Sequence, residues 1–186
     1  MLLQEKTKRY MEYLKLFEDF YDKESNFKKW FEGSKIVDEN NNPLIVYHGA
    51  SFSNKFDEFR IDNIGKNYNL RFGKGFYFTE IKQNAFSYSN YVFEVYLNIK
   101  NPLEVKSSIE YRDVVNNQKK KLGYNRFEMD KLLSKDDNQI LAEMGYDGII
   151  YWYNGKMNEI VAFYPNQIKS ATDNRGTYDS SSNIYT

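Results

Sequence analysis

The chain contains no cysteine and a single histidine among its 186 residues, and its 26 basic and 26 acidic residues cancel. Without cysteine it has neither a disulfide framework nor a thiolate metal site, which fits a reducing compartment. The balanced charge provides no bulk attraction to nucleic acid or anionic lipid. The sequence also lacks the roughly 20 consecutive apolar residues of a membrane helix and the apolar core of a secretory signal. We therefore expect a soluble, cytoplasmic protein with no membrane partner and no indicated nucleic-acid partner.

Three common kinds of site are also missing from the sequence. The single histidine, His48, excludes a two-histidine zinc motif and any serine–histidine triad that does not use it. Gly73-Lys74-Gly75 is followed by Phe78 at the position where a dinucleotide-binding fingerprint needs its third glycine. A phosphate-binding loop of the Gly-x4-Gly-Lys-Ser/Thr form does not occur. We therefore expect neither a metal nor a Rossmann-type site.

The N-terminal region has the pattern of an amphipathic helix. Apolar residues recur every three or four positions between about residues 4 and 23, with charged residues between them. A second, short helix is expected at residues 27–31. We interpret residues 1–26 as a helical extension, which either packs on the outside of the domain or binds a partner.

The rest of the chain predicts a single α+β domain. A short apolar run at residues 44–47 follows a turn-prone Asn-Asn-Asn-Pro segment, which predicts a buried strand that ends at His48 and Gly49. Changes in the hydrophobic period separate the other elements. Further strands are expected at residues 76–78, 92–99, 148–153 and 159–163, and helices at residues 82–91, 124–133 and 138–144.

The C-terminal part contains the strongest local signal of the chain. Asn154-Gly155 predicts a hairpin turn, because both residues tolerate positive φ. This hairpin places Glu159 at the start of a strand. The polar tail at residues 173–186 is rich in serine, asparagine, aspartate and threonine, and we expect it to be poorly ordered.

A site without metal, thiol or phosphate loop suits cleavage of the nicotinamide glycosidic bond. The leaving group is already cationic and departs neutral, so it needs no general acid. The enzyme must orient the substrate and oppose the positive charge that develops on the ribose. Aromatic faces hold a pyridinium ring by stacking and cation–π attraction, and a carboxylate supplies the counter-charge. Tyr77, Tyr88 and Glu159 are the candidates for these roles.

The order and spacing of these residues resemble the His-Tyr-Glu group of ADP-ribosyltransferases, which includes diphtheria toxin and the poly(ADP-ribose) polymerases. Val46-Tyr47-His48-Gly49 is similar to the first motif of the group. The resemblance implies that His48 contacts the adenosine-side ribose and that the backbone of Gly49 pairs with the nicotinamide amide. Gly73-Lys74-Gly75-Phe76-Tyr77-Phe78 is similar to the second motif, whose tyrosine stacks on nicotinamide.

Two later positions extend the resemblance. The second stacking tyrosine of the group follows at a gap of eleven, which is the gap between Tyr77 and Tyr88. The segment from Asn158 to Phe163 is similar to the third motif, whose glutamate, here Glu159, is catalytic. The resemblance therefore implies Glu159, His48 and Tyr77 as catalytic residues. It implies an NAD-binding group of His48, Gly49, Gly75, Tyr77, Ala85 and Tyr88.

A closer likeness is to the ADP-ribosyltransferase domains of phage polyvalent and head-morphogenesis proteins. It runs from Phe27 to about Asp179, and we place the catalytic domain at residues 27–172. The resemblance implies a split pair of small antiparallel sheets around an NAD cleft, with NAD+ as substrate and a host macromolecule, most simply a protein, as acceptor. It also implies a phage product that acts in the cytoplasm of a bacterial cell or is carried in a phage particle. The likeness rests on the segments at residues 27–31, 96–103, 144–150 and 165–172.

Three positions depart from the patterns of the group. Ala85 stands where polymerase-like members have a serine that bonds the nicotinamide amide, so this bond is missing or comes from Ser87. Ala50 replaces the usual serine or threonine after the first-motif glycine. Met157 occupies the position where arginine-modifying toxins carry glutamate or glutamine, which argues against an arginine acceptor.

Each candidate also has a purely structural interpretation. Taken alone, His48 is a structural histidine, Tyr77 and Tyr88 are core aromatics, and Glu159 is a solvated strand residue. Only their joint pattern favours mono-ADP-ribosyl transfer from NAD+. Three alternatives stay open: an NAD glycohydrolase that uses water as acceptor, a domain that binds NAD or a partner without catalysis, and a virion-associated structural module.

Overall fold

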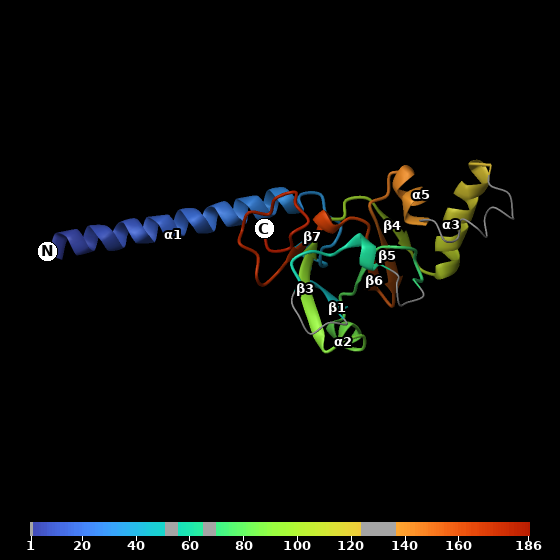
Figure 1. The fold of residues 1–186 in the computed structure, drawn as a ribbon, viewed down its shortest axis with the longest axis horizontal. Helices are drawn as coiled ribbons and strands as arrows, with labels where there is room; N and C mark the ends of the chain where they lie inside the picture. Colours follow the sequence, from blue (N-terminus) through green and yellow to red (C-terminus); the bar gives the residue numbers. More distant parts are fainter. Residues whose placement is uncertain (1, 51–55, 65–69, 124–136) are drawn as a thin grey trace.

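The computed structural model describes residues 2–50, 56–64, 70–123 and 137–186. It confirms the α+β class, with two β-sheets, a long N-terminal helix and helices at the opposite end of the molecule (Figure 1). In chain order the elements are α1 (Leu2–Phe31), β1 (Val46–Ala50), η1 (Ile61–Asn63), β2 (Phe76–Phe78), α2 (Lys82–Phe86), β3 (Tyr91–Leu97), β4 (Pro102–Val105), α3 (Ser108–Lys121), α5 (Asp137–Glu143), β5 (Gly148–Tyr153), β6 (Lys156–Ala162), η2 (Pro165–Gln167) and β7 (Ile168–Ser170).

The two sheets differ in their pairing. The three-stranded sheet, in the order β1-β3-β7, is antiparallel throughout. The four-stranded sheet, in the order β2-β6-β5-β4, is mixed, because β4 runs parallel to β5. The expectation of two antiparallel sheets is therefore wrong for β4. The chain between β4 and β5 passes through α3 and α5, and a parallel pair requires such a long crossover.

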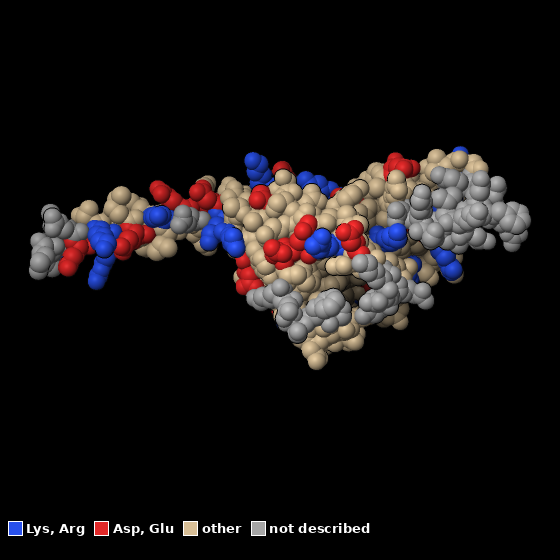
Figure 2. Space-filling view, viewed as in Figure 1, with Lys and Arg blue, Asp and Glu red and all other residues tan. Residues whose placement is uncertain are grey.

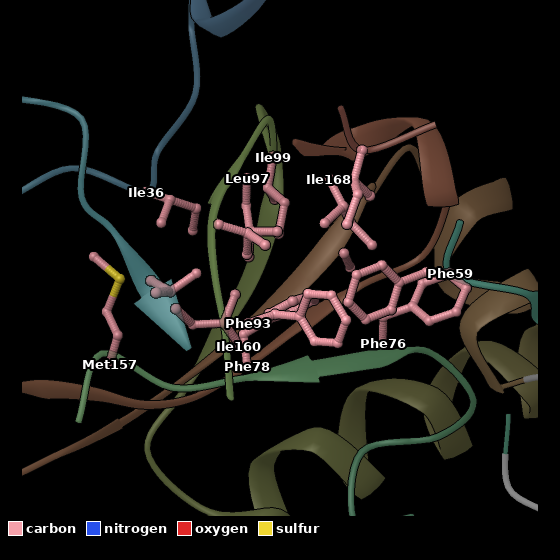
Figure 3. Packing of buried hydrophobic residues seen from close by; sticks show 14 of the residues in the cluster. Ile36, Phe59, Phe76, Phe78, Phe93, Leu97, Ile99, Met157, Ile160 and Ile168 are labelled. Carbon is pink, nitrogen blue, oxygen red and sulfur yellow. The ribbon is translucent and has the colours of Figure 1, made fainter. Parts of the chain in front are cut away.

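Two hydrophobic clusters lie on opposite faces of the four-stranded sheet. The larger cluster fills the space between the two sheets, with Phe76, Phe93 and Ile160 among its buried side chains (Figure 3). The second cluster lies on the other face, where Tyr111 of α3 and Leu141 of α5 cover the sheet. Because successive strand residues point to opposite faces, β5 and β6 contribute alternately to the two clusters, whereas the buried residues of β4 belong to the second cluster.

The N-terminal region forms one continuous helix rather than the two that the sequence predicts. No glycine or proline occurs before Gly33, and α1 ends just before this residue, whose φ is +80°. Only the C-terminal end of α1 packs on the domain, where the ring of Phe27 contacts those of Tyr96 and Tyr178. Residues 5–22 extend away from the domain instead of covering it (Figure 1).

Several predicted boundaries shift in the structure. β1 begins at Val46, later than the predicted start of the strand at residue 44, and runs through His48 and Gly49 to Ala50. The predicted helix at 82–91 stops at Phe86, because the chain from Tyr91 pairs with β1. The C-terminal helix is confirmed as α5 (Asp137–Glu143), and Gly145 follows it with a φ of +92°. The helix predicted at residues 124–133 lies outside the described residues.

The hairpin at Asn154-Gly155 is confirmed. Both residues have positive φ, 52° and 74°, as a two-residue hairpin turn requires. However, β6 begins at Lys156, directly after the turn, and a register shift between Tyr151 and Trp152 accommodates the pairing with β5. Glu159 is therefore in the interior of β6, and its predicted place at the start of a strand is wrong.

The C-terminal tail is packed against the domain, contrary to the poor order expected from its polar composition. Ile184 is fully buried in the cluster between the sheets. The ammonium group of Lys169, also fully buried, donates hydrogen bonds to the carbonyl oxygens of Ser181 (3.1 Å) and Asn183 (2.8 Å). The tail thus binds the ammonium group of Lys169 and contributes Ile184 to the core, and neither contact can be predicted from composition alone.

Charges of both signs are interspersed over the face of the molecule shown in Figure 2. In the part of the chain that the structure describes, no helix is both long and apolar enough to cross a membrane.

Candidate functional site

Strand register places Tyr77 and Glu159 on the same face of the four-stranded sheet. Tyr77 pairs with Val161 across β2 and β6, and Glu159 lies two residues before Val161 on the same side of its strand. Tyr151 of β5 pairs directly with Glu159. This face is the one covered farther along by α3 and α5, so Glu159 lies at the margin of a packed layer with a quarter of its side chain exposed.

Arg71 forms an ion pair with Glu159 that the sequence analysis does not predict. Its Nη1 lies 3.1 Å from Oε1 of Glu159. The guanidinium group also lies over the ring of Tyr151, 4.4 Å from the ring centroid, and 5.1 Å from that of Phe72. The only sequence signal is an arginine two residues before the Gly73-Lys74-Gly75 motif. Nothing in the spacing links it to a glutamate 88 residues later.

The hydroxyl group of Tyr77 is used by the protein itself. It donates to the carbonyl oxygen of Gly73 (2.7 Å) and accepts from the backbone N–H of Phe72 (3.0 Å). Burial raises the pKa of Tyr77 well above its usual value, so the phenol stays neutral. The ring therefore has a fixed position, and among the described residues no aromatic ring stacks on it.

A polar cluster behind this loop supports it from α3 and α5. The fully buried Lys119 donates to Asp137 (2.7 Å), which also accepts from the hydroxyl of Tyr111 (3.3 Å). The next residue, Asn138, donates to the carbonyl oxygen of Lys74 in the glycine-containing loop. The loop before β2 is thus held both by the hydroxyl of Tyr77 and by Asn138 of α5, which the Lys119–Asp137 pair links to α3.

His48 joins the two sheets at their edge. Nδ1 lies 2.7 Å from the carbonyl oxygen of Tyr77, which can only accept, so Nδ1 carries the proton and donates. The ring also contacts the rings of Phe59 and Phe78, with centroids 4.9 and 5.4 Å away. Desolvation lowers the pKa of His48, although the hydrogen bond to Tyr77 opposes this shift. The imidazole is therefore neutral at physiological pH, with Nε2 as an acceptor.

Gly49, Ala85 and Tyr88 form a second group. A Cβ on Gly49 would lie 2.2 Å from the carbonyl oxygen of Ala85 and 3.2 Å from Cβ of Tyr88, so only glycine allows α2 to approach β1 this closely. The side chain of Tyr88 is 70% exposed, so it is not a core aromatic residue. The hydroxyl of Ser87 was the alternative source of the hydrogen bond that Ala85 cannot make to the nicotinamide amide. In the structure this hydroxyl donates to the carbonyl oxygen of Asn84 (2.6 Å).

Backbone pairing connects the two groups. Tyr47 and Thr79 exchange two hydrogen bonds of 2.8 and 3.0 Å, which join the start of β1 to the end of β2. Because paired residues share a face, Gly49 and Tyr77 lie on the same side of this junction. Gly75 approaches β6 closely, since a Cβ there would lie 2.3 Å from Cγ1 of Val161.

Two recesses are lined by residues outside the candidate set. One lies between the end of α1 and residues 33–43, and the other lies beside Trp152. Residues 51–55 and 65–69, which flank β1 and Arg71 in the chain, lie outside the described residues. Within the described ranges, no group of three metal-ligating side chains could hold a metal ion.

Comparison with known protein families gives a match over most of the chain. The family described as "ADP-Ribosyltransferase in polyvalent proteins" matches residues 38–178, which is well over half of the chain and includes every candidate site residue. Neither the curated proteins nor the solved structures give a match.

Proposed function

Because the chain belongs to the family of ADP-ribosyltransferases in polyvalent proteins, we propose that it transfers single ADP-ribose units from NAD+ to a macromolecular acceptor of a bacterial host. In this proposal the transferase unit spans residues 27–172 and acts in the cytoplasm of the host cell. The observation that carries the proposal is the strand register that puts Tyr77 and Glu159 on one face. Neither residue needs a metal for the roles assigned to it.

In the proposed reaction, the bond between C1′ of the nicotinamide ribose and the ring nitrogen breaks. Its electron pair leaves with nicotinamide, which becomes neutral, and positive charge develops on the ribose. A nucleophile of the acceptor then forms a bond to C1′ and loses its proton to Glu159 or to solvent. Glu159, partly shielded in β6, opposes the developing charge more strongly than it would in water.

The other residues bind and orient NAD+. Tyr77 presents a ring of fixed position, and Tyr88 presents an exposed ring beside Gly49. These two rings would hold the nicotinamide ring, while the backbone of Gly49 pairs with its amide. Nε2 of His48 would accept a hydrogen bond from a ribose hydroxyl, because Nδ1 is already committed to Tyr77. In this role His48 positions the substrate and transfers no proton.

Without substrate, Arg71 forms an ion pair with the carboxylate of Glu159. The arriving ribose would have to displace the guanidinium group, because a fixed cation there would repel the charge that develops in the transition state. The side chains of Arg71 and Glu159 are 44% and 26% exposed, and ion pairs this open to water are worth only about 0–1 kcal/mol. NAD+ binding can therefore break the pair at little cost.

A second candidate function is hydrolysis of NAD+ by the same residues. The partial exposure of Glu159 favours it, because water can reach the carboxylate without an acceptor molecule. The products separate the two functions: a transferase attaches ADP-ribose to a macromolecule, whereas a glycohydrolase releases it.

Both functions are tested by incubating the full chain with NAD+ labelled in its adenylate, with and without a bacterial lysate. Nicotinamide release is followed by chromatography, and labelled macromolecules are sorted by sensitivity to protease and nuclease. Labelled macromolecules that disappear with Glu159→Gln support transfer. The matched control is Glu143→Gln, an exposed glutamate on α5. Free ADP-ribose without labelled macromolecules indicates the glycohydrolase. Absence of nicotinamide release under every condition would overturn both and leave a binding module.

A further inference from the structure

α1 carries an aromatic stripe on the part that extends from the domain. At 100° per residue, Tyr10, Tyr13, Leu14, Phe20 and Tyr21 fall on one side of the helix. The four aromatic residues among them are each 62–67% exposed. Exposed aromatic residues gathered on one helix side are typical of an interface and not of a solvated surface.

The extended part of α1 has an apolar side with no covering element among the described residues. It reaches the domain near its C-terminal end, where Asn26 donates to the carbonyl oxygen of Gly176 (3.1 Å). Lys23 also lies against Gly176, so the preceding residues 5–22 give about 27 Å of helix that points into solvent (Figure 1). In proteins, most helical stability comes from packing an amphipathic face and not from helix propensity.

Charge along α1 identifies the partner. Residues 6–12 contain three basic residues and one acidic residue, whereas residues 18–24 contain four acidic residues and one basic residue. From these observations we infer that the aromatic stripe of α1 pairs with the same stripe of a second copy of this chain, in antiparallel orientation. Antiparallel pairing places the basic half of each helix against the acidic half of the other, whereas parallel pairing places like charges together.

The ends of the stripe fit the same arrangement. Lys6 and Glu24 lie at the two ends of the stripe. At 100° per residue, each is rotated by only about 40° from Tyr10 around the helix axis, so both lie on the aromatic side. With Tyr10 opposite Phe20 of the second copy, Lys6 lies opposite the second copy's Glu24. Glu24 also pairs with Lys28 of its own helix (2.6 Å), a contact exposed enough to be shared.

The geometry also sets the expected strength. Two helices packed along roughly 30 Å bury on the order of 1,200 Å², the lower limit for a stable protein–protein interface. The two domains lie at opposite ends of the pair, so they do not collide. We therefore expect a dimer with a micromolar dissociation constant, whose formation does not depend on NAD+ or on the proposed transferase activity.

Sedimentation of the full chain between about 1 and 200 μM tests the dimer. The wild type should change from monomer to dimer over this range, and Tyr13→Glu should remain a monomer with an unchanged melting temperature of the domain. The matched control Ile109→Glu, at a 61% exposed position on α3, should dimerise as the wild type does. A wild type that stays monomeric at 200 μM, or forms a larger oligomer, would overturn the inference.

Orientation is tested by cross-linking, because the chain has no cysteine of its own. Tyr10→Cys and Phe20→Cys proteins should form a disulfide-linked dimer efficiently when mixed and poorly when each is oxidised alone. Efficient self-linking of Tyr10→Cys would show parallel helices and refute the arrangement. A charge exchange gives an independent check: Lys6→Glu and Glu24→Lys should each weaken the dimer several-fold, and their mixture should restore it. Failure of the mixture to recover affinity would contradict the antiparallel register.

Discussion

Arg71 and Glu159 form a hydrogen-bonded ion pair, with Nη1 3.1 Å from Oε1, between the loop before β2 and the interior of β6. The guanidinium group also covers the ring of Tyr151, the strand partner of Glu159. Two regions that are far apart in sequence, the loop before β2 and the β5–β6 hairpin, thus meet at the carboxylate to which the proposed reaction assigns the main electrostatic role. The pair distinguishes two interpretations of Arg71: a cation that NAD+ displaces, or a permanent support for Glu159.

We expect Arg71→Ala to leave kcat at or above the wild-type value, because it removes a cation from the place where positive charge develops. The free energy of unfolding should fall by about 1 kcal/mol or less, from the loss of an exposed ion pair and a cation–π contact. Steady-state nicotinamide release and urea unfolding measure the two quantities. A fall in kcat as large as that of Glu159→Gln would instead identify Arg71 as the residue that holds the carboxylate in place.

Glu159→Gln should lower kcat by a factor of about one hundred or more, with NAD+ affinity within several-fold of the wild type. The reason is that the charge opposed by Glu159 develops mainly in the transition state. Single-turnover kinetics and calorimetric NAD+ titration separate the two effects, and Glu143→Gln serves as the control. Near wild-type turnover in Glu159→Gln would remove Glu159 from the mechanism.

The two tyrosines should respond differently to loss of their hydroxyl groups. Tyr77→Phe leaves the N–H of Phe72 and the carbonyl of Gly73 without this partner, and should cost roughly 1–3 kcal/mol of stability. Tyr88→Phe should change stability by less than about 0.5 kcal/mol, because the side chain is 70% exposed.

Tyr88→Ala should keep the wild-type melting temperature but weaken NAD+ binding by roughly 1–2 kcal/mol, through loss of the stacked ring. Thermal melts and NAD+ titrations on the same samples test this pair of expectations. Unchanged NAD+ affinity in Tyr88→Ala would show that the ring of Tyr88 does not hold the nicotinamide ring.

His48 should make the free energy of unfolding depend on pH in the mildly acidic range. Its pKa is lowered in the folded chain, so below pH of about 6.5 the unfolded chain binds a proton that the folded chain does not. Stability is therefore present above pH 6.5 and falls as the pH drops toward the folded pKa, by at most about 1.4 kcal/mol per pH unit. Because His48 is the only histidine, His48→Gln should remove this dependence between pH 7.5 and about 5.5 in urea titrations.

The same residue should not control the pH profile of activity. A positioning role predicts that His48→Ala weakens NAD+ binding and slows transfer without rescue by added imidazole. Recovery of activity with imidazole, together with an apparent pKa below about 6.5, would assign His48 to proton transfer.

Local patterns predicted much of what lies near the candidate site. The Asn154-Gly155 hairpin follows from the positive φ that both residues accept, and it brings β5 and β6 together. The short aromatic strand at Phe76–Phe78 was also evident from composition. Tyr77 and Glu159 lie on one face because strand periodicity and antiparallel pairing require it once β2 and β6 are neighbours.

Long-range pairings were not accessible in this way. Nothing local indicates that β4 runs parallel to β5, or that Arg71 reaches Glu159, since both depend on how distant segments pack. α3 was missed because its sequence is polar, with Tyr111 and Val115 and the stem of Lys119 providing the buried side.

The tail provides the last test, because a polar composition predicted poor order whereas the structure places Ile184 in the core between the sheets. Ile184→Ala should therefore destabilise the protein by about 2–4 kcal/mol, as truncation of a fully buried isoleucine does elsewhere. The matched control is Ser180→Ala, an exposed position in the same tail, which should change stability by less than about 0.5 kcal/mol. Urea unfolding of both variants measures the difference. Equal stability of the two would mean that the tail does not pack in solution and that its polar composition was the better guide.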